Sequence, residues 1–87
     1  MDHIVEAVRD VLTENLNLGQ RGAALLPDSA LLGSLPELDS MAVVSVITAL
    51  EERFDMTFDD EDINARTFAT LASLADLVRD RAPPDAR

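Results

Sequence analysis

The stretch LDSMAVVSVITALEERF, residues 38–54, carries the strongest helical pattern in the chain. Its apolar side chains recur at spacings of three and four residues, which is the repeat of one face of an α-helix. The inward face consists of Val43, Val46, Ile47, Leu50 and Phe54. Asp39 precedes the pattern, and an aspartate there can accept a hydrogen bond from a first-turn N–H. The pattern therefore predicts a helix that begins at Asp39 and ends near Arg53.

Two further segments show the same apolar repeat. In residues 2–16, the aligned positions are Ile4, Val8, Val11, Leu12 and Leu16, and Asp2 is the expected cap. In residues 70–81, the aligned positions are Leu71, Leu74, Ala75 and Val78, with Leu77 at the edge. Thr70 is the favoured cap of this helix and Thr67 the alternative. Pro83 and Pro84 cannot continue it, so we expect a domain of residues 1–81 followed by a flexible tail, residues 82–87.

Two connections join the predicted helices. Residues 17–38 are expected to form a long ordered loop with a capped turn at Asp28, because many leucines can pin the loop to the core. These leucines are Leu25, Leu26, Leu31, Leu32, Leu35 and Leu38. Residues 55–69 contain DDEDINA, which predicts a loop with one short helix near 60–65 that buries Ile63. The predicted fold is all-α: a small four-helix bundle with three main helices, a short third helix and a long ordered first loop.

The charge of the chain restricts its partners. The formal net charge is −10, from 17 acidic and 7 basic residues, and all the basic residues are arginine. Such a chain repels phosphate backbones and anionic lipid surfaces, so we expect neither nucleic acid nor membrane as a partner. Enzymes with basic patches are favoured instead. No stretch has the length of a membrane span, and no apolar run of signal-peptide type begins the chain, so a cytoplasmic monomer is expected.

Catalytic and metal-binding patterns are missing from the sequence. There is no cysteine, and the single histidine, His3, lies at an N-terminal end that is expected to fray. An EF-hand loop that began at Asp60 would place Ala65 where glycine is needed and Leu71 where the bidentate glutamate belongs. We therefore expect no enzyme and no metal site. The acidic run of residues 59–62 is expected to be a solvated loop whose charges repel one another.

Ser40 is the polar residue whose purpose the helical pattern leaves open. Asp39 already supplies the cap, so the Ser40 hydroxyl is expected to point outward, beside unpaired N–H groups and the positive end of the helix dipole. Such a position is well suited to a covalently attached phosphate. Serine is also common in first turns for conformational reasons alone, and spacing by itself favours that simpler interpretation.

The chain resembles the acyl carrier proteins of fatty-acid and polyketide synthesis over about residues 3–80. Asp39-Ser40-Met41 resembles the Asp-Ser-Leu attachment motif of that family, and ITALEERF follows it at residues 47–54. The resemblance implies that a phosphopantetheinyl transferase joins 4′-phosphopantetheine to Ser40 through its phosphate. It also implies that the thiol of this arm carries acyl groups as thioesters to acyl-activating ligases or synthase enzymes, and that the protein itself is not an enzyme.

Residues 31–54 are similar, more narrowly, to discrete carriers encoded with bacterial exosortase and exopolysaccharide systems. The face expected to meet partner enzymes is the outward side of the same helix, formed by Met41, Val44, Thr48, Glu51 and Glu52. Asp39 before the serine favours an acyl carrier over an aminoacyl or peptidyl carrier, which remains one alternative. A second alternative is an acidic helical adaptor without a prosthetic group.

Overall fold

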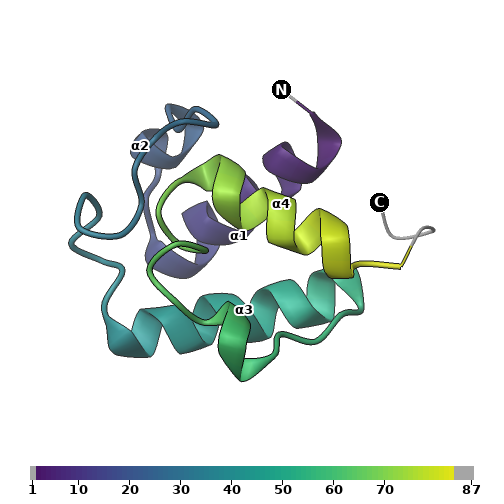
Figure 1. The fold of residues 1–87 in the computed structure, drawn as a ribbon. Helices are drawn as coiled ribbons and strands as arrows, with labels where there is room; N and C mark the ends of the chain where they lie inside the picture. The colour runs from purple at the N-terminus through teal and green to yellow at the C-terminus, as the bar shows by residue number, and fades with distance from the viewer. Residues whose placement is uncertain (1, 84–87) are drawn as a thin grey trace.

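Residues 2–83 are described by the computed structural model, and they form four α-helices and one short 3-10 helix. These are α1 (His3–Leu16), α2 (Gln20–Ala23), α3 (Ser40–Phe54), η1 (Asp60–Asp62) and α4 (Leu71–Arg81). Helix α1 contacts α2, α3 and α4, so it is the central helix of the bundle. In Figure 1, α4 crosses α1 and α3 runs below both. No strand occurs among the described residues, and the predicted all-α fold is confirmed.

Each main helix begins at the cap that the sequence predicted. The Asp2 carboxylate accepts hydrogen bonds from the N–H groups of Ile4 at 2.8 Å and Val5 at 3.2 Å. The bond from Val5 is the main cause that holds the pKa of Asp2 below its ordinary value, and Arg79 acts in the same direction. At α4, the Thr70 hydroxyl accepts from the Ser73 N–H at 3.0 Å, which confirms Thr70 over Thr67. These bonds satisfy first-turn donors that have no partner within the helix.

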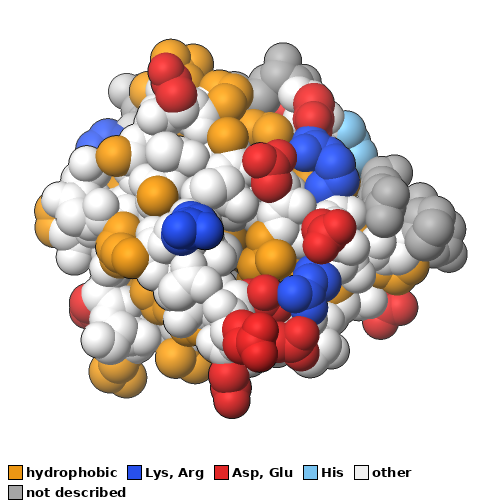
Figure 2. Space-filling model, in the orientation of Figure 1, with side chains coloured by type: hydrophobic (Ala, Val, Ile, Leu, Met, Phe, Trp, Pro, Cys, Tyr) orange, Lys and Arg blue, Asp and Glu red, His pale blue; other side chains and the backbone are white. Residues whose placement is uncertain are grey.

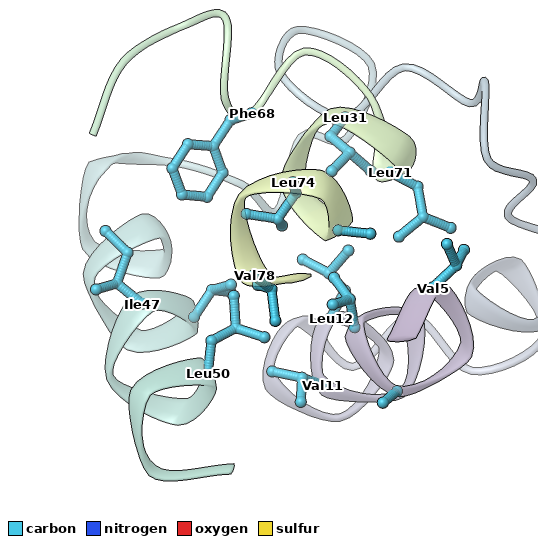
Figure 3. Close-up of a cluster of buried hydrophobic side chains, with 14 of the residues drawn as sticks. Val5, Val11, Leu12, Leu31, Ile47, Leu50, Phe68, Leu71, Leu74 and Val78 are labelled. Atoms are coloured by element: carbon cyan, nitrogen blue, oxygen red, sulfur yellow. The ribbon is translucent and has the colours of Figure 1, made fainter. Parts of the chain in front are cut away.

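The core is an aliphatic cluster to which all three long helices contribute. Figure 3 shows side chains from α1, α3 and α4 meeting in this cluster. The largest fully buried side chains are Val8, Leu12, Leu31, Val46, Leu50, Leu71, Leu74 and Val78. The predicted inward faces are confirmed apart from Val43, which is only half-buried. With so few aromatic residues, stability depends on the fit of aliphatic side chains against one another.

The buried region continues one residue beyond the predicted boundary at residue 81. Ala82 is only 3% exposed, and its N–H donates to the Val78 carbonyl at 2.8 Å. Ala82 therefore belongs to the packed fold and not to a tail. Pro83, the next residue of the expected tail, is half-buried, and residues 84–87 lie outside the described residues.

The first connection contains a short helix that the sequence did not predict. Helix α2 packs against α1 at Gly22, where a Cβ atom would lie 2.1 Å from the Thr13 hydroxyl oxygen. Only glycine permits this approach. A helix of four residues is too short to show an apolar repeat, so periodicity could not find it.

Four of the six leucines expected to pin this connection pack against the core, and two do not. Leu25, Leu31 and Leu38 are buried and Leu35 is half-buried. Leu32 is 43% exposed because it begins a turn, in which the N–H groups of Ser34 and Leu35 both donate to the Leu31 carbonyl. Leu31 takes the core side, and the prediction that Leu32 is buried as well is wrong.

The turn that precedes Leu31 is capped by Ser29 and not by Asp28 as predicted. The Ser29 hydroxyl accepts from the Leu26 N–H at 2.8 Å, and the Ser29 N–H donates to the Leu26 carbonyl at 2.9 Å. Leu26 thus lies at the corner of a turn, where its side chain is 57% exposed. The expectation that Leu26 pins the loop is therefore also wrong.

The second connection contains the predicted short helix, which is limited to η1. The prediction that this turn buries Ile63 is wrong, since Ile63 is 44% exposed and Asp62 is 8% exposed. The physical reason is a reciprocal cap: the Asp62 carboxylate accepts from the Asp59 N–H at 2.9 Å, and the Asp62 N–H donates to the Asp59 carbonyl at 2.9 Å. This arrangement turns Asp62 inward and leaves Ile63 at the surface.

Candidate functional site

Ser40 is the first residue of α3 and is exposed. The cap belongs to Asp39, whose Oδ1 accepts from the Ala42 N–H at 2.8 Å. The Asp39 carbonyl also accepts from the Val43 N–H at 2.9 Å, which closes the first turn. Among the described residues, none forms a hydrogen bond with the Ser40 hydroxyl. The helix start is therefore complete without that hydroxyl, which is left open to solvent.

The surroundings of the Ser40 hydroxyl favour an anion over catalysis. The N–H groups of Ser40 and Met41 have no acceptor within the described part of the chain, and the N-terminal end of a helix carries partial positive charge. The Asp39 carboxylate is already bonded to the Ala42 N–H, and His3 lies on α1. Residues 2–83 thus provide an anion-compatible position in which no side chain is hydrogen-bonded to the Ser40 hydroxyl as a general base would be.

The chain has five serines, and their environments separate them. The Ser29 hydroxyl accepts from the Leu26 N–H in a turn, and the Ser73 hydroxyl accepts from the Thr70 N–H and donates to the Thr67 carbonyl at the start of α4. Ser45 is exposed but lies inside α3, where the backbone N–H groups are already bonded within the helix. Ser34 is exposed in the first connection. Ser40 alone combines an exposed hydroxyl with the N-terminal end of a long helix.

A hollow of about 140 Å³ opens beside the first turns of α3. It is lined by Leu32, Val43, Ile63, Asn64 and Phe68. Val43 follows Ser40 by three residues, a rise of about 4.5 Å along the helix. The hollow therefore lies within one helical turn of the candidate serine, and two of its lining residues come from the segment just after η1.

The lining of this hollow offers little to a polar group. Its one polar side chain is Asn64, whose Nδ2 donates to the Glu61 carbonyl at 2.6 Å and whose Oδ1 accepts from the Thr67 N–H at 2.9 Å. Both ends of the amide are thus used within the local backbone. An apolar group would fit in this hollow, whereas a charged group would lose its hydration there without gaining a hydrogen-bond partner.

The outward face of α3 presents the apolar residues that the sequence predicted. Met41 is 82% exposed and Val44 is 63% exposed, which is high for apolar side chains. Thr48 and Glu52 are exposed further along the same helix. An apolar centre with a charge at its edge is typical of surfaces that bind another protein.

Glu51 does not belong to this free face. Its Oε2 accepts from the Phe58 N–H at 2.9 Å, and the residue is half-buried. Glu51 therefore anchors the chain that leaves α3 through one carboxylate oxygen, whereas Glu52 is fully at the surface. Sequence spacing could not show this, because the donor lies beyond the helix.

The acidic run of residues 59–62 is paired in part and is not simply a repelling loop. Arg81 of α4 donates to Asp59 Oδ2 at 2.7 Å and to Asp62 Oδ1 at 2.8 Å. The hydrogen bond to Asp59 raises the pKa of the Arg81 guanidinium. Figure 2 shows basic side chains lying against acidic ones on the right-hand side of the view. A further pair joins Arg79 to Asp2.

Within residues 2–83, no group of three or more His, Cys, Asp or Glu side chains is arranged to hold a metal ion. None of the helices in the same range is both long and apolar enough to span a membrane.

Comparison with known proteins places this geometry in a family. The sequence pattern described as "Phosphopantetheine attachment site" matches residues 3–78. The fold is similar to the solution NMR structure of a holo acyl carrier protein from Nitrosomonas europaea, with a TM-score of 0.84 and 57% sequence identity. The match covers 92% of this chain and 95% of that one. No curated protein matches the sequence closely enough to be significant.

The site fits a covalently attached phosphate, since it combines an exposed hydroxyl, free N–H groups and a completed helix cap. Members of this family work with phosphopantetheinyl transferases and with biosynthetic enzymes. The chain belongs to the phosphopantetheine-attachment family and is an acyl carrier protein, which holds acyl groups on a covalent 4′-phosphopantetheine arm and is not itself an enzyme.

Proposed function

We propose that Ser40 is the attachment residue and that its Oγ forms the phosphodiester to the 4′-phosphopantetheine arm. The observation that carries this proposal is the exposed, unbonded hydroxyl at the first position of α3, where Asp39 already caps the helix. When bound, the arm supplies a thiol that holds acyl groups as thioesters. Ser40 is then a tether, and Asp39 keeps the helix end in place while a partner enzyme acts on the arm. The Ser40→Ala experiment described in the Discussion tests this proposal.

The apolar hollow supports acyl cargo over aminoacyl cargo. An empty protein cavity of about 150 Å³ accommodates a benzene molecule, so a hollow of about 140 Å³ has room for roughly six carbons. The bonded Asn64 amide leaves no free polar side chain to receive an ammonium group. The hollow is therefore proposed to receive the first carbons of an aliphatic acyl chain delivered from the neighbouring helix start.

Loading the carrier with an octanoyl group is expected to shift the backbone amide NMR signals of Val43, Ile63 and Phe68. An acetyl group on the same arm should leave these signals nearly unchanged, because it is too short to reach the hollow. The exposed turn residue Leu26 serves as the internal control in both spectra. Shifts of equal size with acetyl and octanoyl cargo would show that the hollow does not receive the chain.

The free outward face of α3 is proposed to be the landing surface for partner enzymes. Met41 and Val44 would supply its apolar contact, with Thr48 beside them. Glu52 would pair with a basic residue of a phosphopantetheinyl transferase or of an acyl-activating ligase. The resemblance to carriers of exosortase and exopolysaccharide systems stays a prediction from sequence.

Glu52→Lys is expected to slow modification by a phosphopantetheinyl transferase about twofold to fivefold at low salt, the rate equivalent of about 0.5–1 kcal/mol for an exposed charge pair. The difference should shrink as salt is added. Glu14→Lys is the matched control, since it makes the same change of charge at an exposed position of α1. The measurement is the initial rate of modification of each variant, followed by intact mass. Equal rates for the two variants would mean that Glu52 is only solvated surface.

A further inference from the structure

Arg81 lies in the last turn of α4 and bridges two carboxylates of the η1 turn. Its Nη1 contacts Asp59 Oδ2 at 2.7 Å, and its Nη2 contacts Asp62 Oδ1 at 2.8 Å. A planar guanidinium can make both contacts at once, whereas the single point charge of a lysine cannot reproduce that fork. In the chain, Asp62 lies 19 residues before Arg81 and Asp59 lies 22 residues before it.

The Asp62 end of the clamp is the one buried side chain of its segment. Between the buried side chains of Phe58 and Phe68, Asp62 is the only residue in the buried class. Its side chain is 10% exposed, and its two oxygens accept from Arg81 and from the Asp59 N–H. A buried carboxylate without these partners would be strongly unfavourable. At Asp62, the segment of residues 59–67 is therefore held to the bundle by an ion pair. Most loops are held by the burial of an apolar side chain instead.

The next two residues of this segment form part of the wall of the apolar hollow. Ile63 and Asn64 follow Asp62 directly, and both line the hollow. The Ile63 N–H donates to the Asp60 carbonyl at 3.2 Å, a bond inside the same turn. Because Ile63 is itself 44% exposed, its apolar contacts fix the wall only in part.

We propose that Arg81 is a positioning residue for acyl cargo: by clamping Asp59 and Asp62, it fixes the Ile63–Asn64 wall of the hollow from the far end of α4. This inference rests on the proposed function of the hollow. Removal of the guanidinium leaves Asp62 with no cationic partner, and the turn then moves away from the bundle to let water reach the carboxylate. The wall moves with it, and the hollow loses its shape.

The test compares Arg81→Gln with Arg79→Gln, which removes the same charge from the same helix. Arg79 pairs with Asp2 and Asp76, and neither residue lies in the wall segment. In the unloaded protein, amide hydrogen exchange at Asp62 and Ile63 is expected to be roughly tenfold faster in Arg81→Gln, a local opening that leaves the core protected. Arg79→Gln should change these rates less than about twofold. Arg81→Lys should fall between the two, since it keeps the charge without the fork.

The second readout is the octanoyl-loaded protein. In Arg81→Gln, the cargo-dependent NMR shifts at Val43 and Phe68 should fall to less than half of the wild-type shifts, whereas Arg79→Gln should retain them. Equal exchange rates in the two glutamine variants would overturn the clamp. Faster exchange with unchanged cargo shifts would overturn the positioning role. A wild-type protein that shows no octanoyl shift would instead refute the proposed function of the hollow, and the exchange rates would still decide whether the clamp exists.

Discussion

Ser40→Ala will give a folded protein that a phosphopantetheinyl transferase does not modify. The loss is expected to be complete, because the substitution removes the oxygen through which the arm would be joined. The fold should be preserved, since Asp39 caps α3 without help from Ser40 and alanine is a favourable residue within helices. Intact mass after incubation with the transferase measures modification, and far-ultraviolet circular dichroism measures helix content.

Ser45→Ala and Ser34→Ala are the matched controls, because both remove an exposed hydroxyl within six residues of Ser40. Both variants are expected to be modified as fully as the wild type. Continued modification of Ser40→Ala, or its loss in either control, would place the attachment residue elsewhere. A Ser40→Ala protein that failed to fold would contradict the independence of the Asp39 cap.

Leu50→Ala is expected to destabilise the domain by about 2–5 kcal/mol, the usual cost of deleting a fully buried leucine side chain. Leu50 is 0% exposed and lies in the cluster formed by α1, α3 and α4 (Figure 3). Since small domains are stable by only about 5–15 kcal/mol, this loss is a large fraction of the total. Urea denaturation followed by circular dichroism measures it.

Val44→Ala provides the comparison on the opposite face of the same helix. Val44 is 63% exposed, so its truncation should change the free energy of unfolding by less than about 0.5 kcal/mol. The two variants together test the division of α3 into a core face and a free face. Similar losses of stability in both would show that Val44 is packed against something and is not available to a partner.

The features that could be predicted from sequence are those governed by periodicity and by local chemistry. The long helices follow from apolar repeats, and the caps at Asp2, Asp39 and Thr70 need only a side chain and an N–H two or three residues away. The exposure of Met41 follows from the same helical geometry. Asp-Ser at the start of a helix, taken with the family resemblance, was sufficient to indicate the site.

The features that escaped prediction depend on partners distant in sequence. Glu51 accepts from Phe58 only because the chain turns back after α3. Asp62 is buried because Arg81 reaches it from another helix. The two exposed leucines, Leu26 and Leu32, lie in turns that hydrophobicity alone does not encode. Composition had indicated repulsion at the acidic run, and three-dimensional proximity to an arginine changed that outcome.

The scarcity of apolar burial between Phe58 and Phe68 has a thermal consequence. Exposing apolar surface raises the heat capacity, which makes the free energy of opening curve with temperature. Movement of residues 59–67 exposes a limited amount of such surface, because Ile63 is already 44% exposed and the one buried residue among them is Asp62. The free energy of opening this wall should therefore curve less with temperature than the stability of the surrounding bundle. Access to the hollow would then follow a nearly constant enthalpy of opening, without the loss of stability on cooling that strong curvature brings.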